Sequence, residues 1–320
     1  MASRRLLVLL SAVAFASGSC AANGDGDQLP IDTTFAAEMA SSWHWVGDPQ
    51  RVQIGIRASS GDGVTAVSGG TVDLAFAFVG TGGDEPVAGP TATASYIAVP
   101  GTEPAGEAPG IVTGARGIYE AEDVVFDRAG IWQVTVSASI DGVAQRLTAT
   151  TEVFEDSPIP APGDRAPRTE TLTVDSDVRE GAIDSMADGG GPIPDPELHE
   201  WTIARAIREG RPTLVLFGTP AYCTSLMCGP EVQEVQRLAA DHPDRAVYIH
   251  VEIWKDHDGL VVNRGAADWL LWQRPDGTPE MTEPWLYLIG ADGMILDRWG
   301  SLFDPAEVAT ALEALPPMPS

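Results

Sequence analysis

The sequence predicts a two-domain α+β protein, with an antiparallel β-sandwich over residues 34–155 and an α/β domain over residues 198–320. In the first region apolar residues alternate with polar or small ones, which is the period of half-buried strands. In the second region apolar runs alternate with segments of helical spacing. The stretch between them, residues 156–197, is rich in proline and contains three consecutive glycines, so it predicts a linker.

The first 20 residues predict a signal peptide for export. Two arginines precede an apolar run from Leu6 to Ala16, and small residues lead to Cys20. This ending resembles the lipobox of bacterial lipoproteins, which implies a lipid on Cys20 that anchors the protein to the outer face of the cytoplasmic membrane. The alternative is ordinary cleavage near Cys20 without a lipid. Residues 21–33 are small and polar and predict a tether.

Net charge and motifs limit the partners. The formal net charge is −27 at pH 7, and such a surface repels nucleic acid, so we expect no nucleic-acid partner. The sequence has no glycine-rich phosphate loop and no zinc-type spacing, so we expect no cofactor and no metal. Export implies an oxidising compartment, in which a disulfide can persist.

The strands of the first domain follow from short alternating runs. Val52, Ile54 and Ile56 alternate with less apolar residues. Residues 131–140 and 143–153 flank Asp141-Gly142, which is a strong hairpin signal. Several short strands with glycine-rich turns and no helical spacing predict an immunoglobulin-like sandwich.

Strands and helices alternate in the second domain. A helix over 198–209 precedes the apolar run Leu214–Phe217, which is typical of a buried parallel strand. We then expect a helix that begins at Gly229–Pro230, a strand over 246–251, a helix over 264–273 and a hairpin formed by 285–289 and 294–298. The last helix is predicted to begin after Asp304 as N-cap, with Glu307 closing a capping box.

The most informative feature is the pair Cys223 and Cys228, which stands where the strand at 214–217 meets the next helix. The unpaired N–H groups and the dipole of a helix N-terminus stabilise a thiolate. The chain has three cysteines, and Cys20 belongs to the leader. Cys223 and Cys228 are therefore left to pair with each other.

Three signals together resemble the thioredoxin-like superfamily, and in particular its exported, membrane-tethered members. They are the two cysteines, Pro284 directly before the strand at 285–289, and the hairpin at 291–295. The resemblance covers about residues 198–320 and implies an α/β thioredoxin-like fold there.

The resemblance also implies roles for named residues. Cys223 would be the attacking thiolate and Cys228 the resolving thiol, while Pro284 would shape a substrate groove with Trp285 and Tyr222 beside it. The implied activity is thiol–disulfide exchange with thiols or disulfides of exported proteins.

Two departures from that family affect the chemistry. Four residues separate the cysteines here, where thioredoxins have two. The strand at 214–217 also lacks the buried acid that thioredoxins place behind their active site. Transfer of a proton to the second thiol therefore needs another group, and Glu283 and Glu231 are the nearest candidates by sequence.

Three alternatives remain open from the sequence. The cysteine pair could be a structural disulfide in a non-enzymatic binding or scaffold lipoprotein. It could bind Cu(I) in a chaperone, with His250 or His257 as a third ligand. It could also serve a peroxiredoxin-like peroxidase in which Cys223 attacks peroxide, although Glu283-Pro284 stands where that family has its activating arginine.

Overall fold

The computed structural model describes residues 33–61, 63–80, 85–223 and 227–318. The predicted signal peptide, the lipidation residue Cys20 and the tether up to residue 32 lie outside the described residues. Within the described residues, every helix is too short or too polar to cross a membrane.

The first ten strands form one sheet. They are β1 (Thr34–Met39), β2 (His44–Trp45), β3 (Gln50–Ser60), β4 (Gly63–Ser68), β5 (Thr71–Gly80), β6 (Val87–Ala98), β7 (Gly110–Ile111), β8 (Gly117–Val124), β9 (Gly130–Ile140) and β10 (Val143–Phe154). The order is β2-β10-β9-β5-β6-β8-β3-β4-β7, and β1 pairs with β3. The sheet is mixed, because β2 runs parallel to β10 while the other pairs are antiparallel.

The strand pattern within this sheet follows the sequence. Val52, Ile54 and Ile56 of β3 are buried in a shared apolar core. The predicted hairpin is confirmed, since β9 and β10 pair in antiparallel register. Its turn places Asp141 at φ 48° and Gly142 at φ 77°, the left-handed pair that a tight hairpin needs.

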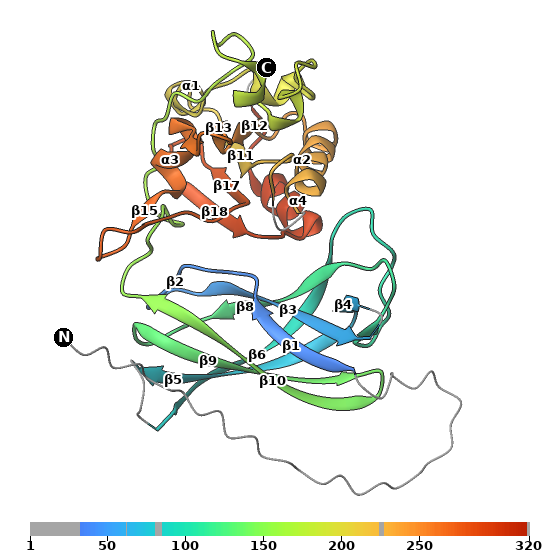
Figure 1. Ribbon diagram of the computed structural model, residues 1–320. Coiled ribbons are helices and arrows are strands. Elements are labelled where there is room, and N and C mark those ends of the chain that lie inside the picture. The colour runs from blue at the N-terminus through green and yellow to red at the C-terminus, as the bar shows by residue number, and fades with distance from the viewer. Residues whose placement is uncertain (1–32, 62, 81–84, 224–226, 319–320) are drawn as a thin grey trace, which may run out of the picture. The chain divides into compact units, whose positions relative to one another are not determined.

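The predicted fold class, an immunoglobulin-like sandwich followed by an α/β thioredoxin-like fold, is wrong. Strands contain 42% of the residues and helices 17%. The main feature is a large, curled, mixed sheet rather than two stacked sheets. The curl of the sheet is visible in Figure 1. The pairing register shifts within the β3–β8, β5–β6 and β5–β9 pairs, and such irregularities bend long strands. Alternating burial is the same in a sandwich and in a curled sheet, so the sequence pattern did not distinguish them.

A four-stranded sheet follows, in the order β12-β11-β17-β18. Its strands are β11 (Thr213–Gly218), β12 (Val247–Glu252), β17 (Trp285–Ile289) and β18 (Ile295–Gly300). The predicted buried parallel strand is confirmed, because β11 is buried throughout and runs parallel to β12. Strand β17 is antiparallel to both β11 and β18.

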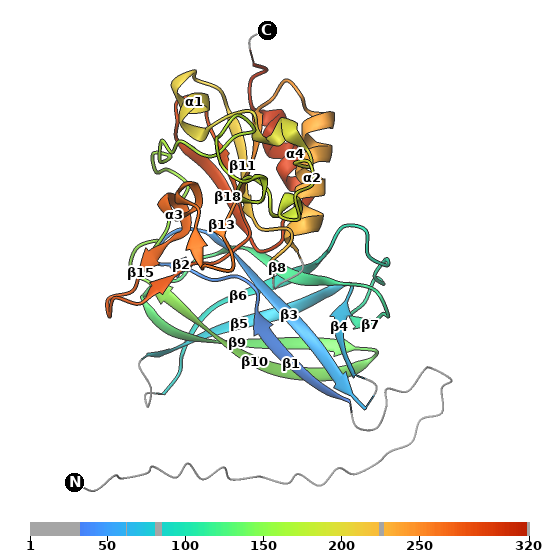
Figure 2. The same ribbon diagram turned by 45° about the horizontal axis from the view of Figure 1, so that its top comes forward.

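Helices cover both faces of this sheet. They are α1 (Ile203–Arg208), α2 (Cys228–Asp241), α3 (Arg264–Leu270) and α4 (Pro305–Ala314). Helices α1 and α3 lie on one side of the sheet and α2 and α4 on the other (Figure 2). Apolar residues of α1 and α3 join one core cluster, and those of α2 and α4 join another. Two short hairpins complete the region: β13 (Trp254–Asp256) with β14 (Val261–Val262), and β15 (Trp272–Gln273) with β16 (Pro279–Glu280).

The helix ends partly match the sequence. Asp304 caps α4 by accepting a hydrogen bond from the Ala306 amide. Glu307 does not close the expected capping box: its carboxylate pairs with Arg51 of β3 and accepts from the Trp299 indole. Helix α2 begins at Cys228, two residues before Pro230.

The proline-rich segment is built into the structure. It contains the short helices η1 (Glu180–Ala182) and η2 (Ser185–Ala187), and η3 (Pro196–His199) begins at its end. Arg298 of β18 donates hydrogen bonds to the carbonyls of Ile159 and Pro160. The described residues from 33 onward belong to one compact unit.

Candidate functional site

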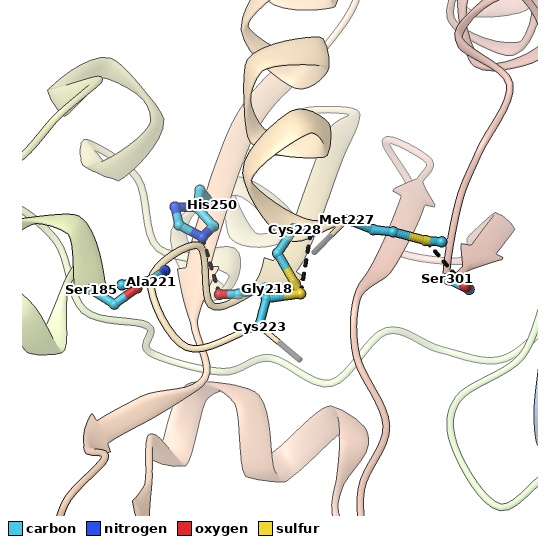
Figure 3. The surroundings of a disulfide bond; sticks show 8 residues. All are labelled: Ser185, Gly218, Ala221, Cys223, Met227, Cys228, His250 and Ser301. Atoms are coloured by element: carbon cyan, nitrogen blue, oxygen red, sulfur yellow. Dashed lines mark hydrogen bonds between the residues drawn. A yellow bond between two sulfur atoms is a disulfide. The ribbon is translucent and has the colours of Figure 1, made fainter. Parts of the chain in front are cut away.

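Strand β11 and helix α2 position the two cysteines. The strand lies in the middle of the four-stranded sheet and ends at Gly218, and a short loop then leads to Cys223. Helix α2 begins at Cys228. The two residues form a disulfide with their Cα atoms 6.0 Å apart (Figure 3). The structure therefore brings Cys223 and Cys228 together as the sequence predicts.

The two sulfur atoms have different surroundings. Cys228 is fully buried at 0% exposure, whereas Cys223 is half-buried. The backbone N–H of Cys228 donates to the Cys223 Sγ atom at 3.3 Å (Figure 3). This N–H belongs to the first turn of a 14-residue helix, so it would stabilise a thiolate on Cys223. An attacking molecule can reach Cys223 more readily than Cys228.

Pro284 lies beside the cysteines across Gly218. The Glu283–Pro284 peptide bond is cis, directly before β17. A Cβ atom built on Gly218 would lie 3.5 Å from the Cβ of Cys228 and 3.9 Å from the Cβ of Pro284. Pro284 and Cys228 therefore flank the same glycine.

Glu283 supplies an acidic group at the disulfide. A carboxylate oxygen of Glu283 and both sulfur atoms lie within 4.8 Å of one another. Its Oε2 atom is buried without a hydrogen-bond partner among the described residues. Burial, and then the negative charge of Glu252, raises the pKa of Glu283 to about 7. A carboxyl group with this pKa can give or take a proton near neutral pH.

The other acidic candidate, Glu231, is placed differently. It is buried on the first turn of α2. Burial raises its pKa well above the usual value, against a hydrogen bond with the backbone of Phe303. Glu231 is not part of the group that Glu283 forms with the two sulfur atoms.

Tyr222 lies next to Cys223 at the edge of the site. Its ring stacks on the His257 imidazole with the centroids 3.9 Å apart, and its hydroxyl donates to the Asp188 carboxylate. The bond to Asp188, with burial, raises the pKa of Tyr222 to about 12. Tyr222 thus has a half-buried ring beside the reachable cysteine.

Trp285 is placed in the core rather than on an open groove. Its side chain is 7% exposed, and its indole stacks on Trp43 with the centroids 6.2 Å apart. Its Nε1 donates to Thr282 Oγ1. Of the residues predicted for the groove, only Tyr222 lies partly at the surface.

A buried polar cluster lies next to the end of β11, and sequence reasoning missed two of its members. His250 of β12, Asp184 and His199 are each 1% exposed, and one ligand atom from each lies within 4.8 Å of the others. His250 donates from Nε2 to the Gly218 carbonyl at 3.2 Å (Figure 3). Asp184 falls in the segment predicted as a linker. The only signal for His199 was its apolar neighbour Leu198, which indicated burial.

Asp184 and the two histidines shift one another's pKa values. Burial would raise the pKa of Asp184, but the two histidines hold it well below the usual range. Burial lowers the pKa of His199. In His250 the lowering by burial is outweighed by Asp184, so the pKa is raised. The second candidate histidine, His257, is partly exposed beside Tyr222 and is not in this group.

Comparison with known proteins assigns no family. No family model matches the sequence, and no curated protein matches it. Among solved structures, a β-glucosidase from Listeria innocua in complex with glucose is similar over 38% of this chain, with 11% identity and a TM-score of 0.20. The chain covers 16% of that protein. A likeness at this level indicates neither a shared fold nor a shared activity.

Proposed function

We propose that this protein is an exported thiol–disulfide oxidoreductase that acts through Cys223 and Cys228. The observation that carries the proposal is the asymmetric disulfide, with Cys223 half-buried, Cys228 fully buried and the Glu283 carboxylate within 4.8 Å of both sulfur atoms. Thiol–disulfide exchange needs one sulfur that a substrate can attack, and it is faster when a nearby acid gives a proton to the sulfur that leaves. Burial of Cys228 directs the attack to Cys223. The proposal also draws on the resemblance of the Cys223, Cys228 and Pro284 motifs to those of thioredoxin-like proteins.

Reduction of the disulfide begins with a substrate thiolate. The thiolate attacks Cys223 Sγ, the Cys223–Cys228 bond breaks, and a mixed disulfide forms between the substrate and Cys223. Cys228 leaves as a thiolate in a buried site, which disfavours the charge. Protonated Glu283 then gives its proton to Cys228.

The second step completes the exchange. A second thiolate of the substrate attacks the substrate sulfur of the mixed disulfide, which forms a substrate disulfide and releases Cys223 as a thiolate. The Cys228 backbone N–H stabilises that thiolate. The substrate dithiol has lost two electrons and the protein disulfide has gained them. The reverse sequence, with Glu283 taking the proton from Cys228, reduces a substrate disulfide.

Trapping and the reduction potential test this proposal. We expect Cys228→Ser to accumulate mixed disulfides with exported proteins through Cys223, because the resolving thiol is gone. Cys223→Ser is the matched control and should trap far less. Equal trapping by both variants, or a reduction potential below about −300 mV, would leave the disulfide as a structural bridge in a binding or scaffold protein.

Glu283→Gln tests the proton carrier. We expect it to slow reduction of the disulfide by glutathione about 10²-fold at pH 6, which is the usual size of general-acid assistance. The ratio of the wild-type rate to the variant rate cancels the ionisation of glutathione. It should fall as pH rises through about 7, because Glu283 loses its proton there. A ratio of one at every pH would remove Glu283 from the mechanism.

A further inference from the structure

The Asp184–His199–His250 cluster has ring nitrogens that nothing in the described structure satisfies. Both nitrogens of His199 and the Nδ1 atom of His250 are buried without a hydrogen-bond partner among the described residues. His199 Nε2 and His250 Nδ1 both face the same carboxylate oxygen, Asp184 Oδ2, at 3.5 and 3.4 Å. Buried polar atoms are normally paired, so this arrangement calls for a group that joins them.

The hydrogen bond to Gly218 fixes the orientation of the His250 ring and directs Nδ1 toward Asp184. Because His250 Nε2 lies 3.2 Å from the Gly218 carbonyl, Nε2 carries a proton and donates it. Neutral His250 then has a lone pair on Nδ1, and this lone pair faces the Asp184 oxygen. Two acceptors then face each other, which is unfavourable unless a proton or a metal ion lies between them. A backbone carbonyl that fixes the far nitrogen is also the usual second contact of a metal-binding histidine.

We propose that Asp184, His199 and His250 bind a zinc ion. Imidazole nitrogen and carboxylate oxygen are zinc ligands. Ligands about 2.1 Å from a tetrahedral zinc ion lie about 3.4 Å from one another. Ligands at a similar distance from an octahedral ion would lie about 3.0 Å apart. The separations of 3.4 and 3.5 Å between Asp184 and the two histidines match the tetrahedral ion.

Zinc at this position would tie together three separate segments. Asp184 belongs to the proline-rich segment, His199 to η3 and His250 to β12. The neighbouring carboxylate of Glu252 is buried and accepts from the Ser185 and Trp254 amides, so a cation here also offsets a second buried negative charge. The ion would hold the segment that contains Asp184 against β12 and would act as a structural element, independent of the exchange reaction.

Metal binding by the oxidised protein tests this site. With the disulfide intact the two cysteines are not thiolate ligands, so zinc uptake then reports on other residues. After treatment with a chelator, we expect one zinc ion per chain in a competition assay, and a rise in Tm when zinc is added. His250→Asn and Asp184→Asn should each weaken binding by at least about 100-fold. His257→Asn is the control with the same change at a partly exposed histidine and should bind as the wild type does.

A spectroscopic measurement keeps the test valid if a variant fails to fold. Cobalt(II) bound to the oxidised wild-type protein should show the intense visible bands of a tetrahedral site, and X-ray absorption of the zinc form should show nitrogen and oxygen ligands without sulfur. Binding of less than one zinc ion per chain, an octahedral spectrum or a sulfur ligand would overturn the proposal. In the first case a proton on His250 Nδ1, rather than a metal, joins the ring to Asp184.

Discussion

Replacing Glu283 by glutamine keeps the shape of the side chain and removes its ionisation, so the variant isolates the effect of one buried charge. Burial and the neighbouring Glu252 raise the pKa of Glu283 from 4.5 to about 7. A folded carboxyl with a raised pKa holds more protons than the unfolded chain between these two values. Its contribution to stability is therefore present below about pH 4.5 and is lost as pH rises through about 7.

The size of the effect follows from the two pKa values. At 1.36 kcal/mol for each pKa unit, the raised pKa of Glu283 lowers the free energy of unfolding, relative to a side chain that does not titrate, by about 1 kcal/mol at pH 5 and about 3 kcal/mol at pH 8. Glutamine has no charge to bury. We therefore expect Glu283→Gln to have a higher free energy of unfolding than the wild type by these amounts, with the larger gain at pH 8.

Urea unfolding of the oxidised protein at pH 5 and pH 8 measures this difference. Glu313→Gln, on the exposed surface of α4, is the matched control and should change the free energy of unfolding by less than about 0.5 kcal/mol at both pH values. A Glu283→Gln effect of the same size at pH 5 and pH 8 would refute the argument, because the carboxyl would then not titrate between them.

Two further predictions concern other parts of the chain. Arg51 pairs with Asp297 and Glu307 and lies over the Trp299 ring. Arg51→Lys loses the planar guanidinium and should lower the free energy of unfolding in urea by about 1–2 kcal/mol. The control is Arg57→Lys at an exposed ion pair, which should change this free energy by under about 0.5 kcal/mol. Cys20→Ala should release the protein from the membrane fraction of cells without changing its Tm, and persistent membrane association would contradict lipidation at Cys20.

Local features of the fold were predictable because they depend on neighbouring residues. The alternation in β3, the Asp141-Gly142 turn, the buried run of β11 and the Asp304 cap each follow from a few consecutive side chains. The candidate site was predictable in the same way, since Cys223 and Cys228 are close in sequence and stand at one strand–helix junction.

Only the tertiary structure decided the rest. One curled sheet and two stacked sheets bury the same alternate residues, so no pattern in the sequence separates them. The Glu283 carboxylate reaches the disulfide because β17 pairs with β11, which fixes a contact between residues about 60 positions apart. Asp184 and His250 meet in the same way, because the proline-rich segment packs against β12, where the Ser185 amide donates to Glu252, and the proline content did not reveal this contact. Contacts of this kind form when segments that are distant in the sequence pack together in the core. The spacing of residues along the chain does not determine that packing.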